Sequence, residues 1–194
     1  MTALDSLLKE VAACQLCAEH LPLGPRPVVQ LHPEARLLIV GQAPGTKVHE
    51  TGIPFNDPSG DRLRSWLGVN RETFYDPAKI ALMPTGFCYP GRAHRGGDLP
   101  PRKECAPRWH GRLRPLLGGV RLTLLVGQYA QAHYLGRRRK RTLGETVRAW
   151  EEYLPEFWPT PHPSWRVNYW LKRNPWYEEQ ALPALRRRVT EILE

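Results

Sequence analysis

Four cysteines are the residues of this chain whose types and spacing most clearly predict a chemical site. Two residues separate Cys14 from Cys17, and sixteen separate Cys88 from Cys105. Two thiolates on one turn supply half of a tetrahedral ligand shell, and the second pair must come from elsewhere in the fold. Zinc and an iron–sulfur cluster both accept four thiolates, so the spacing alone leaves both open. The alternative is four small buried hydrophobic side chains, which suits Cys88 and Cys105 better than the Cys-x-x-Cys pair.

A second candidate site is the glycine- and proline-rich segment Gly41–Gly60. Its four glycines and three prolines predict a stiff, shaped loop, with Ser59 or Asp61 as the cap of a following helix. Within it, Phe55 offers an aromatic face to a planar base, and Asn56 offers amide donors and acceptors. The alternative for Phe55 is simple packing beneath the loop.

Short apolar runs predict the strands that position these residues. Ala35–Val40, Ile80–Met83 and Leu122–Val126 are each followed by a segment that contains glycine, and sequence typical of helices lies between them. Strands alternating with helices indicate a parallel α/β sheet, whose ligands bind at the carboxyl ends of the strands. We find no repeat and no linker, so we expect one domain over residues 1–194.

Helices are expected at both ends of the chain. Residues 3–13 space leucine and valine at helical intervals, directly before the first cysteine pair. The last helix is predicted to begin near Asn174 as its N-cap, with Pro175 in the first turn and an interruption at Pro183.

Composition excludes several classes of protein. The chain carries 28 Lys and Arg against 19 Asp and Glu, a formal net charge of +9, and 41% of its residues are hydrophobic. This is an ordinary globular composition, and no apolar run is long enough to span a membrane. The first residues lack the pattern of a secretory signal, and four cysteines are too few for a disulfide scaffold, so we expect the protein to lie in the reducing cytoplasm. We also expect a monomer. The excess of positive charge favours a polyanionic partner, nucleic acid before membrane, although many proteins are simply basic.

Three ordered motifs resemble the uracil-DNA glycosylase superfamily. Gly41-Gln-Ala-Pro-Gly45, with Gly52-x-Pro54-Phe55 and Ser59-Gly60 after it, resembles the first motif of that superfamily, and His162-Pro163-Ser164 resembles the second. Between them, Gly127-Gln-Tyr-Ala-Gln-Ala stands where the family-4 enzymes have a similar strand-to-helix turn. Each motif is short, and their order together with the cysteines makes the resemblance fairly specific. It implies a three-layer α/β/α sandwich around a mainly parallel four-stranded sheet.

The resemblance also implies roles for individual residues. The family-4 enzymes hold a 4Fe–4S cluster with four cysteines, which favours a structural cluster on Cys14, Cys17, Cys88 and Cys105, with zinc as the alternative. In these enzymes a base flipped out of DNA is stacked, held by its edge and cleaved from its sugar. By motif match, Phe55 is the stacking platform with Gly41 and Ala43 beside the base, and His162 donates to the developing charge on a uracil oxygen. Ser164, Trp165 and Arg166 then belong to the DNA-binding loop.

The chain departs from the family pattern at three positions. Gln42 and Ala43 stand where relatives carry a catalytic Glu or Asp, and Pro84 replaces the Asn that reads uracil. None of the three side chains can deprotonate water. Of the three, Gln42 alone offers an amide to the edge of the base, and that amide is neutral. Other glycosylases of the superfamily position water with a neutral Asn, so loss of the carboxylate predicts slow or altered activity. The replacements available nearby are His49, Glu50, Asn56 and Asp57, with Asn56 reading the base and either carboxylate activating water.

Basic segments are the remaining candidates for contact with DNA. Five consecutive cations, predicted either to be a solvated loop or to grip phosphates, are Arg137, Arg138, Arg139, Lys140 and Arg141. Arg92, His94 and Arg95 lie in the loop between the last two cysteines, and Arg186–Arg188 are expected on the outer face of the last helix.

Together these residues predict a DNA repair glycosylase that excises uracil or a related deaminated base from DNA. The alternatives are a non-catalytic or weakly active nucleic-acid-binding protein of the same fold and a hydrolase of small molecules or nucleotides. The last lacks the usual glycine-rich phosphate motifs.

Overall fold

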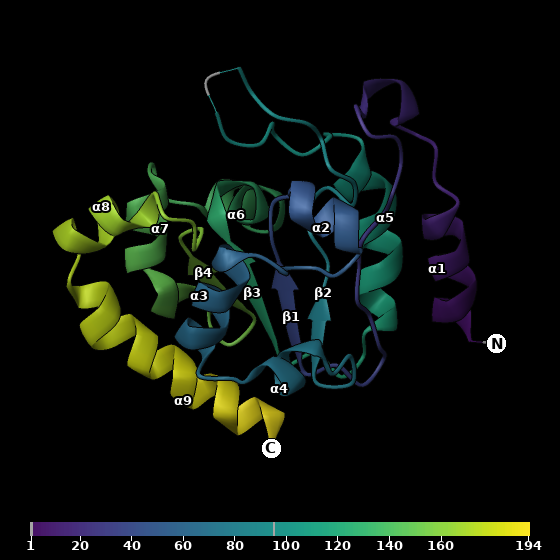
Figure 1. Cartoon of the computed structure of the whole chain (residues 1–194). Coiled ribbons are helices and arrows are strands. Elements are labelled where there is room, and N and C mark those ends of the chain that lie inside the picture. Colours follow the sequence, from purple (N-terminus) through teal and green to yellow (C-terminus); the bar gives the residue numbers. More distant parts are fainter. Residues whose placement is uncertain (1, 95) are drawn as a thin grey trace.

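Four short parallel strands form the centre of the protein, as a computed structural model of residues 2–94 and 96–194 shows (Figure 1). The strands are β1 (Leu37–Val40), β2 (Ile80–Leu82), β3 (Leu122–Val126) and β4 (Phe157–Thr160). Their order in the sheet is β2-β1-β3-β4, and every neighbouring pair is parallel. The central strand β1 pairs in register with both neighbours, Leu38 lying opposite Ala81 and Thr123.

Alternate strand residues face two separate hydrophobic layers, because successive side chains of a strand point to opposite faces. Leu37 and Ile39 pack with helices α3 (Pro58–Leu67) and α9 (Leu182–Leu193). Leu38 and Val40 pack with α1 (Ala3–Ala12), α5 (Cys105–Leu113) and α6 (Gly127–Leu135). The expected three-layer α/β/α sandwich is therefore confirmed.

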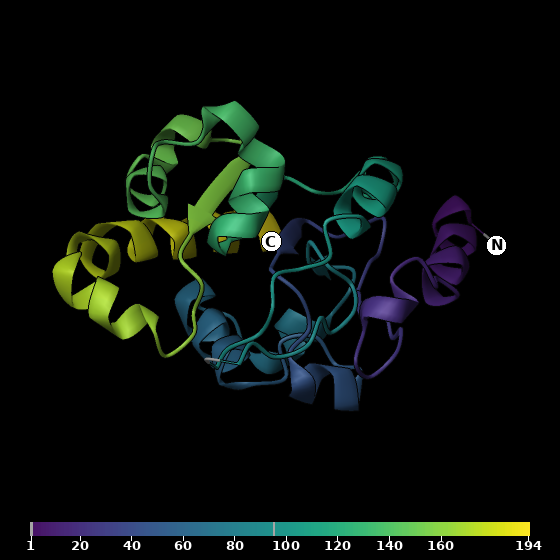
Figure 2. The same cartoon turned by 90° about the horizontal axis from the view of Figure 1, so that it is seen from above.

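The other helical segments connect these layers. They are η1 (Ala18–His20), α2 (Thr46–Thr51), α4 (Arg71–Tyr75), η2 (Arg114–Leu116), η3 (Gly136–Arg138), α7 (Leu143–Arg148), η4 (Trp150–Tyr153), α8 (Val167–Arg173) and the π-helical η5 (Tyr177–Ala181). Helices α1 and α8 lie at opposite ends of the molecule in both views (Figures 1 and 2). Within the described residues, no helix has the length and apolar character needed to cross a bilayer.

The structure corrects the expected limits of several elements. The first strand begins at Leu37 rather than Ala35, and the segment Gly41–Gly60 contains the helix α2. The cap of α3 is Asp57, whose carboxylate accepts from the backbone N–H of Gly60, and not Ser59 or Asp61. Pro58 occupies the first turn of α3, where a missing N–H costs no hydrogen bond, and this places the cap one residue before it.

The C-terminal region also differs from the expected single helix. Asn174 ends α8 instead of capping α9, and the chain re-enters helical geometry through η5. Pro183 lies in the first turn of α9, directly after the π-helical turn. Proline has no N–H to donate to the preceding turn, and the wider π-helical turn before it accommodates this missing hydrogen bond. As expected, Arg187 is exposed on the outer face of α9.

Candidate active site and cysteine cavity

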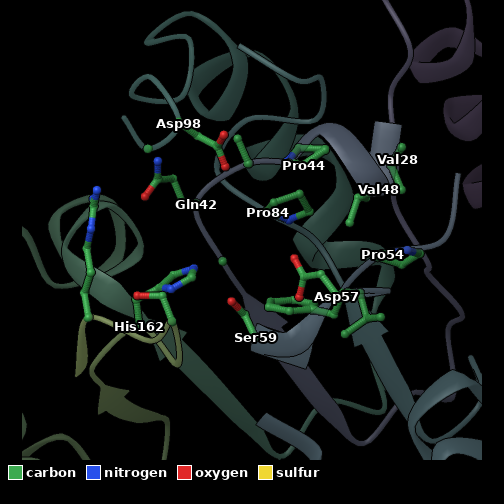
Figure 3. A pocket seen from close by; sticks show the side chains of 18 of the residues that line it. Val28, Gln42, Pro44, Val48, Pro54, Asp57, Ser59, Pro84, Asp98 and His162 are labelled. Atoms are coloured by element: carbon green, nitrogen blue, oxygen red, sulfur yellow. The ribbon is translucent and has the colours of Figure 1, made fainter. Parts of the chain in front are cut away.

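A pocket of about 400 Å³ opens at the carboxyl ends of the strands (Figure 3). Its walls come from the segments that follow three strands, from the turn before α3, and from the loop between the last two cysteines. The lining residues that matter below are Gly41, Gln42 and Ala43 after β1, Pro84 after β2, His162, Ser164, Trp165 and Arg166 after β4, Phe55 and Asp57 before α3, and Arg92, Gly97 and Asp98 of the cysteine loop. This is the edge at which parallel sheets bind ligands.

The ring of Phe55 forms one wall of the pocket on an unusual backbone. Its φ of +54° is a left-handed conformation that costs a non-glycine residue about 1–2 kcal/mol. A Cβ atom on Gly41 would lie 3.1 Å from the Phe55 ring, and one on Gly60 would lie 1.8 Å from the Phe55 carbonyl oxygen. Both glycines of the motif therefore make room for Phe55. Its ring also meets Phe74 edge-on, with the ring centroids 6.1 Å apart.

The buried guanidinium of Arg64 holds the backbone beneath this ring. It donates to the Phe55 carbonyl at 3.5 Å and to the hydroxyl of Tyr75 at 3.3 Å. The Tyr75 hydroxyl in turn donates to the carbonyl of Pro54 at 3.0 Å. These bonds fix the two carbonyls on either side of the strained residue, so the position of the ring is set by packing rather than by a free loop.

His162 follows the edge strand β4, Pro84 follows the opposite edge strand β2, and both line the pocket (Figure 3). It packs over Gly127, where an added Cβ would lie 3.4 Å from the His162 Cβ. Burial lowers the pKa of His162, and the nearby carboxylate of Asp57 opposes that shift. The imidazole is therefore neutral at pH 7, with an N–H that can donate.

Asp57 contributes a carboxylate to the same pocket (Figure 3). One of its oxygens accepts from the Gly60 N–H at 2.8 Å and caps α3. The same charge acts on the pKa values of both His162 and Asp98. The cap of α3 thus brings a carboxylate to the pocket, whereas Gln42 and Ala43 contribute none.

The other replacements suggested by the sequence lie away from the pocket. Glu50 is exposed near the end of α2 and is not among the lining residues. The side-chain oxygen of Asn56 accepts from Arg71 at 3.2 Å, so its amide is turned away from the base site. Gln42 does line the pocket, and its amide donates to the Leu99 carbonyl at 3.2 Å.

The mouth of the pocket is formed by the motif loop of His162 and by the cysteine loop. Arg62 holds the carbonyl of Ser164 at 2.9 Å. Arg166 packs against Gly97 and donates to the Gly96 carbonyl at 3.5 Å, which joins the two loops. These contacts hold the guanidinium of Arg166 beside the pocket that it lines.

The structure adds Asp98 to this rim, a residue that the sequence did not single out. Burial raises the pKa of Asp98, and Arg92 opposes that shift. The only signal in the sequence was its place in the loop between two cysteines, beside Arg92 and His94. Arg95 lies outside the described residues.

The basic run Arg137–Arg141 lies elsewhere. The guanidinium of Arg138 stands 5.9 Å from the ring centroid of Phe157, the first residue of β4, and Lys140 forms an ion pair with Glu152. The opposite end of β4 leads into the pocket, so the run is found at the amino ends of the strands. The run is not among the residues that line the pocket, and its contact with phosphates stays a prediction.

The four cysteines line one small, mostly apolar cavity between α5 and the N-terminal segment. The same cavity is walled by apolar side chains that include Leu21, Phe87 and Trp109. The Cys105 sulfur accepts from the Phe87 N–H at 3.3 Å. Burial raises the pKa of Cys88 to about 11 and that of Cys105 to about 12. In this surrounding an isolated thiol stays protonated, and a thiolate needs a positive partner.

Arg102 supplies positive charge at the edge of this cavity. Its hydrogen bond to Cys17 opposes the rise that burial causes in the pKa of that thiol. A second nitrogen of Arg102 donates to Glu104 at 3.1 Å, while its Nε is buried without a partner. Four sulfur donors and an unpartnered buried N–H fit a group that carries thiolate ligands and negative charge. Among the described residues, no three His, Cys, Asp or Glu side chains are close enough to hold a single metal ion.

A buried histidine links the cysteine cavity to the pocket. His110 lies on α5, and its Nε2 is 3.0 Å from the Pro84 carbonyl, while its Nδ1 is 2.9 Å from the Tyr134 hydroxyl. Because a carbonyl only accepts, Nε2 carries the hydrogen and Tyr134 donates to Nδ1. Burial lowers the pKa of His110 to about 4. This neutral imidazole fixes Pro84, the residue that stands in place of the family's base reader.

The fold and the pocket together define an α/β protein with a candidate ligand site at the carboxyl ends of its strands, and the family follows from the sequence match. The family model of the uracil-DNA glycosylase superfamily matches residues 28–186, so the chain belongs to that superfamily. This assignment supports DNA glycosylase activity in general, with DNA as the partner. Cys14 and Cys17 lie before the matched region. Among solved structures, the chain is similar to SMUG2 of Pedobacter heparinus, with 16% identity, a TM-score of 0.45, and coverage of 79% of this chain and 76% of that chain.

Proposed function

We propose that this protein is a DNA glycosylase that removes uracil, or a related deaminated base, by hydrolysis of the N-glycosidic bond. The observation that carries the proposal is that Phe55 and Asp57, before α3, line one pocket with His162, which comes from a distant segment after β4. An aromatic face can stack on a flipped base, a neutral N–H can donate to its edge, and a carboxylate can activate water, so the three groups suit excision.

Each of these groups has a distinct part in the reaction. Phe55 stacks on the flipped base, and the His162 N–H donates to a base oxygen as the glycosidic electron pair moves onto the base. Asp57 orients a water molecule and accepts its proton while the water oxygen bonds to the sugar C1′. The C1′–N bond breaks, and the base leaves as an anion that takes up a proton from solvent.

We further propose a 4Fe–4S cluster in the cysteine cavity, held by Cys14, Cys17, Cys88 and Cys105. All four cysteines line one cavity, and their spacing resembles that of the family-4 enzymes, which hold such a cluster with four cysteines; zinc is the alternative. When bound, such a cluster cross-links distant segments and supplies electron-transfer chemistry, of which excision needs only the cross-link. Arg102 offsets the negative charge of the thiolates. Iron and sulfide analysis and a brown colour support the cluster; a colourless protein with stoichiometric zinc contradicts it.

The activity is tested with a panel of oligonucleotides that contain uracil, hypoxanthine or xanthine, as single strands and as duplexes. Alkali cleaves the abasic product, and the cleaved fraction measures excision. We expect cleavage by the wild type and losses of about 10²-fold or more for Phe55→Ala and His162→Ala. Lack of cleavage on every substrate, at excess protein with an intact metal site, contradicts the proposal.

The alternative is a member of the superfamily that binds nucleic acid without cleaving it. It is favoured by Pro84, which offers the base no side-chain amide and whose carbonyl is engaged by His110. Such a protein binds the oligonucleotides of the panel with a steep salt dependence and leaves every base attached. For either function, we propose that the protein is a monomer in the cytoplasm.

A further inference from the structure

Two aromatic side chains, Trp165 of the pocket lining and Tyr169 of α8, are more exposed than the other large apolar residues. Trp165 is 74% exposed and Tyr169 is 69% exposed, and the next among the described residues, Leu16, is 55% exposed. Single exposed apolar residues are ordinary on protein surfaces, but a pair beside a pocket indicates an interaction site.

A short turn joins the two aromatic residues. Val167 donates its N–H to the Ser164 carbonyl, and Asn168 donates to that of Trp165, so this turn leads from Trp165 directly into α8. Residues four apart in an α-helix lie on the same side, which places Tyr169 and Arg173 together on α8. Trp165, Tyr169 and Arg173 are called here the α8 strip, which begins at the pocket with Trp165 and continues along α8.

Each ring of the strip carries a guanidinium. Arg166 lies 5.5 Å from the ring centroid of Trp165, and Arg173 lies 5.6 Å from that of Tyr169. Arg173 also donates to the Tyr169 hydroxyl at 3.2 Å. Residues 161–177 contain three cations and no carboxylate. The strip is therefore an aromatic surface with a positive charge beside each ring, and one face of each ring stays open to a ligand.

We propose that the α8 strip binds the single-stranded DNA beside the target base, with Tyr169 stacking on an unpaired nucleotide and Arg173 contacting its phosphate. Proteins that bind single strands combine aromatic stacking platforms with a basic groove, and the strip has both. It is also continuous with the pocket through Trp165, and α8 projects at the end of the molecule away from α1 (Figures 1 and 2). The inference rests on the proposed function for the choice of DNA as the ligand.

The position of the strip also sets a preference between strands. A base paired in a duplex has its faces covered by its neighbours, so it cannot stack on Tyr169. Tyr169 therefore raises affinity for single strands and leaves that for duplexes nearly unchanged. A charge contact alone acts on both, because both carry phosphates.

Fluorescence anisotropy with undamaged DNA tests the strip without requiring excision. The probes are a labelled oligothymidylate of about 15 nucleotides, near the site size of single-strand binders, and a duplex of equal length. Tyr169→Ala is expected to raise the Kd for the single strand by about 5- to 100-fold and that for the duplex by less than about twofold. Tyr169→Phe keeps the ring and is expected to bind nearly as the wild type does.

Charge is tested with Arg173→Ala against Arg121→Ala, a matched loss of an exposed arginine directly before β3, at the amino ends of the strands. The first is expected to lower the slope of log Kd against log salt for the single strand by about 0.7, and the second to leave it unchanged. The thermal unfolding midpoint of each variant serves as the check on folding, because both side chains are exposed.

Unchanged single-strand affinity in Tyr169→Ala, or an equal loss for single strand and duplex, overturns the proposal; the first result leaves the strip as a surface for a protein partner. A wild type that binds single strands through Tyr169 but excises no base sinks the proposed activity and leaves the strip intact. A wild type that excises bases but binds single strands equally well with and without the Tyr169 side chain supports the proposed activity and overturns the role of the strip.

Discussion

Asp57 performs two tasks in the structure, and two substitutions separate them. Its carboxylate caps α3 through the Gly60 N–H, and it faces the pocket near His162. Asparagine at this position keeps an oxygen for the cap and removes the negative charge, whereas alanine removes both. The variants Asp57→Asn and Asp57→Ala therefore differ in helix capping and agree in lacking the pocket carboxylate.

The structure gives different magnitudes for the two tasks. Loss of an N-cap costs about 1 kcal/mol, and a change of that size lowers the Tm of a chain of this length by about 2–4 °C. Asp57→Ala is expected to show this shift, and Asp57→Asn to keep nearly the wild-type Tm. Loss of a group that activates water costs about 10²- to 10⁴-fold in rate, and both variants are expected to show it.

Single-turnover excision from a uracil-containing single strand, with alkaline cleavage of the product, measures the rate, and calorimetry measures the Tm. Glu50→Gln is the matched control, because Glu50 is the rival carboxylate of the same segment and is exposed outside the pocket. A wild-type rate in Asp57→Asn refutes the assignment of water activation to Asp57. A large loss in Glu50→Gln alone moves that assignment to Glu50.

Three further predictions concern other parts of the structure. Gly60→Ala places a Cβ 1.8 Å from the Phe55 carbonyl oxygen, so we expect the free energy of unfolding to fall by about 1–3 kcal/mol. We also expect the excision rate to fall by more than the unfolded fraction explains, whereas Ser65→Ala on the same helix changes neither the rate nor the free energy of unfolding. His110 has a pKa of about 4 in the folded protein against 6.5 for the free side chain, so the unfolded chain takes up the proton first as the pH falls. The contribution of His110 to the free energy of unfolding is full above pH 6.5 and falls by up to about 3 kcal/mol toward pH 4, which urea midpoints will record. The same pH dependence in His110→Gln argues against this cause. Replacing all five cations of Arg137–Arg141 by Gln is expected to change single-turnover excision by less than about twofold, because the run lies at the amino ends of the strands; a tenfold loss places DNA there.

The strands and the cysteine site were predictable because their signals are local. Apolar runs such as Leu122–Val126 read directly as buried parallel strands, and that strand has the predicted limits. The fourth strand was not located in the sequence because Pro159 interrupts its apolar pattern. It is tolerated there because β4 is an edge strand that pairs only with β3. Proline lacks the N–H that a second neighbour would need.

The choice between rival site residues depended on the direction in which each side chain points, which the sequence does not show. Glu50 and Asp57 lie seven residues apart in one loop, and both were candidates for the water-activating group. The helix α2 carries Glu50 outward, while the cap of α3 turns Asp57 inward. Likewise, five adjacent cations predict a charged surface, and only the length of α6 decides that Arg137–Arg141 emerge at the far end of the sheet.

One short segment after β2 determines how the two cavities affect each other. Pro84 lines the pocket, and Phe87 and Cys88 line the cysteine cavity only three and four residues later. The Thr85 hydroxyl bonds to the Gly41 carbonyl at 3.1 Å, and His110, on the helix that begins at Cys105, holds the Pro84 carbonyl at 3.0 Å. A group that holds the cysteines would therefore also restrain the pocket wall, because the Thr85 and His110 hydrogen bonds tie this segment to the loop after β1 and to α5. Under the proposed function, the cysteines then influence excision by holding Pro84 and its neighbours in place.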